Sequence, residues 1–67
     1  MSISYKRLWK LLIDNDMKKK DLSKIAHISN STITKMSKGE NVTTEILAKI
    51  CKCFDCKIED IVEFIED

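Results

Sequence analysis

The chain has 67 residues, of which 43% are hydrophobic and 34% charged, with one glycine and no proline. This length allows one domain over residues 1–67, and the scarcity of glycine and proline argues against hairpin-rich folds and against a glycine-rich phosphate loop. Twelve basic and eleven acidic residues leave a net charge of +1, which taken alone speaks against a strongly basic nucleic-acid-binding protein.

The sequence shows no segment suited to a membrane. No apolar run exceeds three residues, as at Leu11, Leu12 and Ile13, and the first residues lack the apolar stretch of a signal peptide. We therefore expect a cytoplasmic protein without membrane contact.

Three cysteines, Cys51, Cys53 and Cys56, lie near the end of the chain. Their odd number argues against a disulfide framework and favours reduced thiols. Cys53 and Cys56 have the spacing of metal ligands, but no second Cys or His pair lies nearby in the sequence, so we expect no metal site. His27 has no evident partner for acid–base chemistry, and we expect neither a cofactor nor an enzyme.

Apolar residues at helical spacing predict two helices in the first part of the chain. The first is predicted from about Ser4 to Asn15 and the second over about residues 19–26, with a turn between them at Asn15 and Asp16. The residues expected to face inward are Tyr5, Leu8, Leu12 and in part Leu11 from the first helix, and Leu22, Ile25 and Ala26 from the second.

A third helix is predicted over about residues 30–37. Ser29 is a suitable N-cap residue, because its hydroxyl can accept a hydrogen bond from a free backbone N–H group. Ile33 and Met36 are predicted to face inward, and Gly39 stands just past the helix end as a C-cap residue.

Two further helices are predicted in the C-terminal part. Thr43 is a suitable N-cap for a helix that runs to about Phe54, and a fifth helix is predicted from about Ile58 to Ile65. Five short helices, none of them stable alone, indicate an all-α domain with one shared core. The inner faces are predicted to be Leu47, Ile50, Cys51 and Phe54, and Ile58, Ile61, Val62 and Ile65.

Residues 19–38 have the pattern of a helix-turn-helix. Ala26, at the end of one predicted helix, lets the next helix cross it closely. The outward side chains of that next helix are short or flexible hydrogen-bonding groups without a carboxylate, as a helix that reads base edges in the major groove requires. They are Asn30, Ser31, Thr34, Lys35 and Lys38.

Lys18, Lys19 and Lys20 lie together where the second helix is predicted to start. Positive charge at a helix start opposes the helix dipole and does not favour the helix itself. A DNA phosphate would interact favourably with these lysines, although a run of charges is more commonly a solvated surface. Because these lysines precede a predicted helix whose outward side carries no carboxylate, we favour phosphate contact over a merely solvated surface.

Residues 17–62 resemble the Cro/CI-type helix-turn-helix domains of phage repressors and the XRE family. The similarity is carried by Leu22-x-x-Ile25-Ala26, Ile28-Ser29, Ser31-Thr32-Ile33, Gly39 and Leu47-x-x-Ile50-Cys51-x-x-Phe54. Residues 8–12 and 37–42 and the cysteine-rich fourth helix further resemble small stand-alone regulators, often carried on bacterial mobile elements. The resemblance implies a five-helix lambda-repressor-like fold and double-stranded DNA as the partner.

The resemblance also implies roles for single residues. It places Asn30, Ser31, Thr34 and Lys35 at base-reading positions, and we expect Lys18, Lys19, Lys20 and Lys38 to contact phosphates. Two residues depart from the family pattern. Lys18 replaces the usual Ser or Thr N-cap, which weakens that helix start by about 1 kcal/mol, and His27 replaces a glycine that is common in the turn.

The function we expect is that of a sequence-specific transcriptional regulator, in the manner of a repressor. One recognition helix makes few contacts, so a homodimer on a palindromic operator is expected. The candidate dimer contacts are Trp9, Phe64 and Ile65. The alternative is a protein-interaction module on the same fold that binds another regulator and has lost DNA binding. The sequence shows no small-molecule ligand site.

The near-neutral total charge conceals a division along the chain. Residues 1–39 carry nine basic and three acidic side chains, a net of +6, whereas residues 40–67 carry three basic and eight acidic side chains, a net of −5. We expect the basic part to face DNA phosphates and the acidic part to face away from them.

Overall fold

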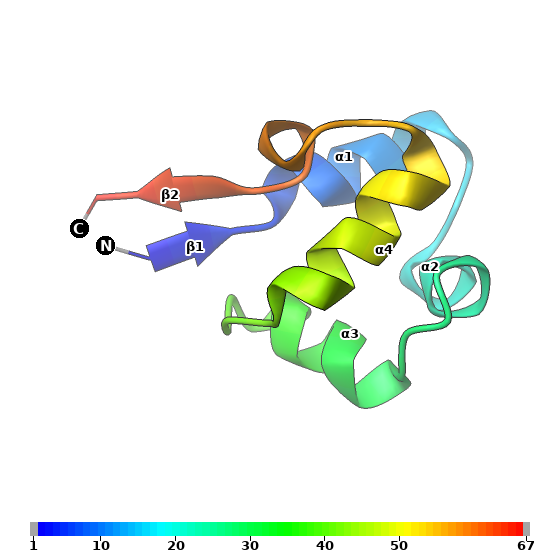
Figure 1. The fold of residues 1–67 in the computed structure, drawn as a ribbon, viewed down its shortest axis with the longest axis horizontal. Coiled ribbons are helices and arrows are strands. Elements are labelled where there is room, and N and C mark those ends of the chain that lie inside the picture. The colour runs from blue at the N-terminus through cyan, green and yellow to red at the C-terminus, as the bar shows by residue number, and fades with distance from the viewer. Residues whose placement is uncertain (1, 67) are drawn as a thin grey trace.

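Four α-helices form most of the computed structural model, which describes residues 2–66 (Figure 1). They are α1 (Lys6–Asp14), α2 (Lys19–Ile25), α3 (Asn30–Ser37) and α4 (Thr44–Phe54). The 3-10 helix η1 (Ile58–Asp60) and the strands β1 (Ser2–Ser4) and β2 (Glu63–Ile65) make up its remaining regular structure. The predicted helical class is confirmed, and no helix among the described residues is long and apolar enough to cross a membrane.

The predicted fifth helix over residues 58–65 is wrong. The chain makes one 3-10 turn in η1, and β2 then pairs with β1 in a two-stranded antiparallel sheet in which Ile3 lies opposite Phe64. β-branched and aromatic side chains suit a strand, and pairing with β1 satisfies backbone groups that a helix would have satisfied internally. Figure 1 shows the sheet projecting from the helical body, with the start of β1 and the end of β2 at its tip.

The sheet also changes what was predicted for neighbouring residues. α1 begins at Lys6 rather than Ser4, because Ser4 belongs to β1, where its hydroxyl accepts a 3.3 Å hydrogen bond from the Lys6 backbone N–H. Ile61 is buried as predicted, but Ile58 and Ile65 are 46% and 41% exposed. The helical spacing therefore predicted some of the buried residues of this segment correctly, but it predicted the wrong backbone conformation.

Two helix starts are capped as predicted. The Ser29 hydroxyl accepts a 3.3 Å hydrogen bond from the Thr32 backbone N–H, and the Thr43 hydroxyl accepts one of 3.3 Å from that of Ile46. At the start of α2, Lys18 offers no side-chain acceptor. There the Asp21 carboxylate accepts a 2.9 Å hydrogen bond from the Lys18 backbone N–H. This bond is the half of a capping box in which a side chain of the first turn reaches back to the N-cap residue.

All four α-helices end with the same device. Each is followed by a residue with a φ of 50° to 75°, in the left-handed region. The N–H of the next residue then donates to the carbonyl five residues earlier, at 2.8–3.1 Å, as in a Schellman motif. Three of the left-handed residues carry a side chain and so meet a steric cost that glycine avoids. The four are Asp16, His27, Gly39 and Asp55.

One core joins all of these elements. α1 is tied to the loop before α4 by Tyr5, whose hydroxyl donates a 2.7 Å hydrogen bond to the Glu40 carbonyl. Ile25, predicted to face inward, is 44% exposed, because Leu22 and Ala26 define the buried face of the short helix α2. The buried apolar residues are Tyr5, Leu8, Leu12, Leu22, Ala26, Ile28, Ile33, Met36, Leu47, Ile50, Ile61 and Val62.

Candidate nucleic-acid interface

α3 lies along an outer edge of the molecule, at the bottom of the view in Figure 1. Ile33 and Met36 anchor it to the core, with 6% and 1% of their surfaces exposed. Helical geometry turns the opposite side outward. All four residues predicted to read bases are exposed on this outer side: Asn30, Ser31, Thr34 and Lys35.

The hydrogen bonds of these four side chains differ. The Thr34 hydroxyl donates to the Asn30 carbonyl at 3.0 Å, so it presents acceptor lone pairs and a methyl group to the outside. The Ser31 hydroxyl lies 3.0 Å from that of Ser29, in the N-cap cluster. α3 therefore offers donors, acceptors and a methyl group on one side.

A surface depression of about 250 Å³ separates α3 from the start of α4, and Lys35, Asn41 and Thr43 border it. Asn41 is exposed in the loop that follows Gly39. Sequence reasoning did not select it as a site residue. The signal in the sequence that could have identified Asn41 is its polar amide, which follows shortly after the C-cap residue Gly39.

The lysines at the start of α2 differ in their surroundings. Lys18, Lys19 and Lys20 are all exposed. The Lys19 ammonium, however, donates a 3.0 Å hydrogen bond to the Ser37 hydroxyl and lies 4.3 Å from the centroid of the Trp9 ring. Lys19 thereby connects α2 to the end of α3 and to α1.

A depression of about 480 Å³ lies beside this contact, bordered by Lys6, Lys19 and Lys38. The structure thus brings together two of the four predicted phosphate contacts and leaves Lys18 and Lys20 outside the depression. It also adds Lys6, which sequence reasoning missed. The available signal was the spacing of Lys6 and Trp9, three residues apart on one helix and therefore neighbours on its surface.

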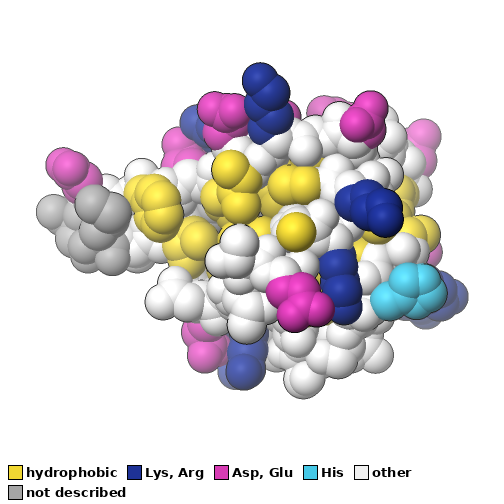
Figure 2. All heavy atoms as spheres, in the orientation of Figure 1, with side chains coloured by type: hydrophobic (Ala, Val, Ile, Leu, Met, Phe, Trp, Pro, Cys, Tyr) yellow, Lys and Arg dark blue, Asp and Glu magenta, His cyan; other side chains and the backbone are white. Residues whose placement is uncertain are grey.

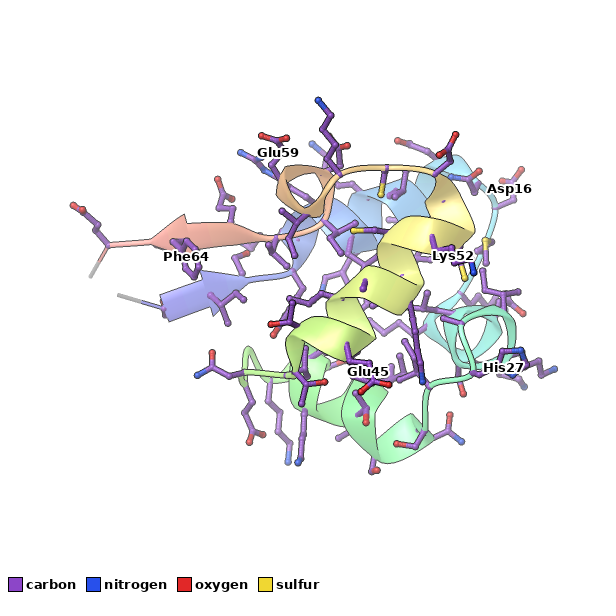
Figure 3. All side chains as sticks on the ribbon, viewed as in Figure 1. Asp16, His27, Glu45, Lys52, Glu59 and Phe64 are labelled. Atoms are coloured by element: carbon purple, nitrogen blue, oxygen red, sulfur yellow. The ribbon has the colours of Figure 1, made fainter. Side chains whose placement is uncertain are left out.

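The three predicted dimer contacts do not form one surface. Phe64 is 70% exposed on β2 and, as Figure 3 shows, lies at the opposite end of the molecule from His27. Figure 2 shows hydrophobic side chains exposed along the projecting sheet and onto the neighbouring part of this face. Ile65 and the half-buried Trp9 instead border the depression described above, and Trp9 packs at a tilt against Tyr5, with ring centroids 6.4 Å apart.

The cysteines are distributed between two environments. The Cys53 thiol donates to the Ile25 carbonyl at 3.4 Å, whereas Cys56 is half-buried and its backbone N–H donates to the Cys51 carbonyl at 3.1 Å. Burial, the Cys51 thiol and the carboxylates of Asp60 and Asp55 raise the pKa of Cys56 to about 11. Among residues 2–66, no three His, Cys, Asp or Glu side chains lie close enough together to hold a metal ion.

The C-terminal acidic segment is fastened to α1 by Arg7. Its guanidinium donates to the Glu59 carbonyl at 2.7 Å and lies 3.2 Å from the Glu63 carboxylate. Arg7 is the one arginine of the chain. Its contacts draw it toward η1 and β2 rather than toward the depression lined by lysines.

Comparison with known proteins extends these observations. A family model described as the Cro/C1-type HTH DNA-binding domain matches residues 7–67. Among solved structures, the chain is similar to the crystal structure of the transcriptional regulator VanUg in its form II, with 44% sequence identity and a TM-score of 0.94 over 98% of this chain and 88% of that chain. No curated protein matches the sequence.

Proposed function

Because the chain belongs to the family of Cro/C1-type helix-turn-helix DNA-binding domains, we propose that it is a sequence-specific transcriptional regulator that binds operator DNA as a homodimer. The observation that carries this proposal is the outer side of α3, which is exposed, rich in hydrogen-bonding groups and free of carboxylates. This side enters the major groove.

Base reading is assigned to Asn30, Ser31, Thr34 and Lys35. The Asn30 amide can donate and accept at once, as paired hydrogen bonds to adenine require, and Lys35 donates to guanine acceptors. Thr34, with its proton engaged by the helix backbone, offers its methyl group to thymine or accepts from an amino group.

Phosphate contact is assigned to Lys18, Lys19, Lys20 and Lys38. These contacts fix the register of α3 on the duplex and carry no sequence information themselves. They lie in the part of the chain with a net charge of +6, so the acidic remainder does not oppose the approach to DNA.

The homodimer is proposed to form through the projecting sheet. Phe64, on β2, is 70% exposed, the largest exposed fraction among the hydrophobic residues of this strand. A second copy of the chain would cover the Phe64 side chain and would place two α3 helices on half-sites about one helical turn apart.

The proposal has consequences for the cellular role. A DNA-binding protein of this kind works in the bacterial cytoplasm, where the chromosome and mobile elements lie. Occupation of an operator excludes other proteins from it, so repression follows from binding alone. No catalysis is needed.

Selection of duplexes from a random library by the purified protein, followed by fluorescence anisotropy, tests the base-reading role. Asn30→Ala and Lys35→Ala are each expected to weaken binding to the selected duplex by about 1–3 kcal/mol and to relax the preference at one base position. Lys57→Gln removes an exposed lysine beside η1 and is the control expected to leave binding unchanged. Thermal denaturation confirms that each variant is folded.

An equal affinity for selected and scrambled duplexes would contradict sequence-specific binding. If the protein still captured another regulator after Lys19→Glu with Lys35→Glu, and its affinity for DNA did not change measurably, the interaction-module function would replace sequence-specific DNA binding.

The dimer is tested separately by sedimentation equilibrium. Phe64→Glu places a charge on an exposed strand position and is expected to yield monomers that bind one half-site but not two half-sites with high affinity. Wild-type protein that remained monomeric on a two-half-site duplex would rule out this dimer.

A further inference from the structure

Three helices meet at the Lys19 side chain. The lysine comes from α2, the ring beneath its ammonium belongs to Trp9 of α1, and the hydroxyl that accepts its hydrogen bond belongs to Ser37 of α3. The Ser37 hydroxyl uses its own proton in a 3.1 Å hydrogen bond to the Ile33 carbonyl. Its oxygen is therefore oriented as an acceptor toward Lys19.

The Lys19 ammonium can donate more hydrogen bonds than its two contacts use. A lysine ammonium has three N–H donors, and Ser37 takes one of them. The face of the Trp9 ring attracts the cation without accepting a conventional hydrogen bond. The side chain is thus held in one place while donors stay available to an anion.

Holding the lysine in place favours ligand binding. A free lysine side chain loses rotamer freedom when it binds a phosphate, and this loss reduces affinity. At Lys19, the Trp9 ring and the Ser37 hydroxyl restrict the side chain before any ligand arrives. Trp9, half-buried against Tyr5, is itself fixed by packing.

The charged side chains that line the adjoining depression are all positive. The volume of the depression is about 480 Å³, and Lys6, Lys19 and Lys38 line it, with no Asp or Glu among the lining residues that the structure describes. Three cations without a counter-charge attract an anion. Because the end of α3 forms one wall, the anion that fits is a phosphodiester of the duplex that α3 contacts.

We infer that α1 is part of the DNA interface: Lys6 contacts a backbone phosphate in this depression, together with Lys19 and Lys38, and Trp9 is a positioning residue that holds the Lys19 ammonium toward the same phosphate. This inference rests on the proposed DNA binding and deepens it. It also gives Trp9 a role other than that of a dimer contact.

A double-mutant cycle with Trp9→Leu and Lys19→Met tests the role of Trp9, measured as the affinity for the selected duplex. Trp9→Leu keeps an apolar cover but removes the ring, and is expected to weaken binding roughly three- to tenfold. In the Lys19→Met background, the same change is expected to alter affinity by less than about twofold, since the group that Trp9 positions is gone.

Salt dependence tests the phosphate contacts. Lys19→Met and Lys6→Gln are each expected to reduce the slope of log affinity against log salt concentration, by less than the value of about 0.9 for one whole phosphate contact, because three lysines share this phosphate. Trp9→Leu should leave this slope unchanged, because it removes no charge. Lys57→Gln is the charge-matched control and is expected to change neither affinity nor slope.

Each contrary result has a distinct meaning. Multiplicative losses in the cycle would show that Trp9 does not act through Lys19, and a Lys6→Gln variant that behaved like Lys57→Gln would remove Lys6 from the interface. Loss of the dimer in Trp9→Leu, measured by sedimentation, would make Trp9 a dimer contact and overturn the inference. Wild-type protein that bound no duplex would instead overturn the proposed function.

Trp9→Phe guards against a folding defect in Trp9→Leu. It retains an aromatic face, and we expect its affinity to stay within about threefold of the wild type, with the coupling to Lys19 preserved. If Trp9→Phe lost as much affinity as Trp9→Leu while both remained folded, the ring face would not be what positions Lys19.

Discussion

At the scale of single residues, the Cys56 thiol shows how packing sets reactivity. Its pKa is raised to about 11, first by burial and then by the Cys51 thiol and two nearby carboxylates. We expect Cys56 to react with iodoacetamide far more slowly than the exposed Cys53 at pH 8, because the thiolate is the reactive form. Mass spectrometry of partly labelled protein gives the order of reaction, and equal labelling of the two cysteines would contradict the expectation.

The same pKa makes stability depend on pH. The folded chain holds the Cys56 proton more tightly than the unfolded chain, in which the pKa is near 9.0. This contribution to stability is complete below about pH 9 and is lost as the pH rises to about 11. Burial also raises the pKa of Tyr5, which adds a loss of the same sign. Between pH 8 and 10.5, the free energy of unfolding in urea should decline less steeply with pH for Cys56→Ala than for the wild type.

His27 and Gly39 both adopt left-handed backbone conformations, with φ of 54° and 75°. His27→Gly is expected to stabilise the chain by about 1 kcal/mol, and Gly39→Ala to destabilise it by a similar amount. A side chain at Gly39 would meet the Ile3 carbonyl at an ordinary 3.8 Å, so the cost comes from the backbone alone. Denaturant unfolding measures both changes, and shifts of the same sign would contradict this account.

At the scale of the elements, the start of α2 combines a weak cap with a proposed phosphate contact at Lys18. Lys18→Ser supplies the missing side-chain acceptor and is expected to raise the free energy of unfolding by about 1 kcal/mol. The same change removes a proposed phosphate contact and should lower the salt slope of DNA binding by about 0.9. Chemical unfolding and anisotropy at several salt concentrations check the two effects, and a gain in stability without a change in slope would remove Lys18 from the interface.

The sequence predicted a helix correctly where it carried a cap residue at both the start and the end of that helix. Ser29 and Gly39 flank α3, and its bounds of Asn30–Ser37 agree with the prediction. The segment after α4 had helical spacing but neither a clear cap nor a signal of its partner. Its conformation depends on β1, about 60 residues away in the sequence, and no local pattern reports such a pairing.

The candidate site divides in the same way. The outward side of α3 followed from its own periodicity, because burial of Ile33 and Met36 decides which residues remain outside. The contact among Trp9, Lys19 and Ser37 did not follow, since it depends on how α1 packs against two other helices.

At the scale of the whole molecule, charge and architecture are aligned. The helix-turn-helix belongs to the basic part of the chain, whereas η1 and β2 belong to the acidic part. In Figure 1, α3 and η1 lie on opposite sides of α4. The molecule therefore carries an electric dipole that turns α3 toward a polyanion as the two approach.

Removal of the last strand tests how far the helical body depends on the sheet. Deletion of residues 63–67 removes β2 and the 3.2 Å ion pair between Arg7 and Glu63. We expect the free energy of unfolding to fall by about 2 kcal/mol through loss of the strand hydrogen bonds. Phe64→Ser keeps the backbone pairing and, at a protein concentration at which the chain is monomeric, should change the free energy of unfolding by less than about 0.5 kcal/mol. Equal losses for the two variants would show that the Phe64 side chain, not the pairing, stabilises this end.

The pairing of β1 with β2 also orders events during protein synthesis. α1 to α4 rely on short-range contacts and can begin to form while the chain is still being made. Ser2–Ser4 are translated before the helices but have no strand to pair with until Glu63–Ile65 have left the ribosome. The sheet can therefore form only after all four α-helices have been translated, and any surface that it creates becomes available later than theirs.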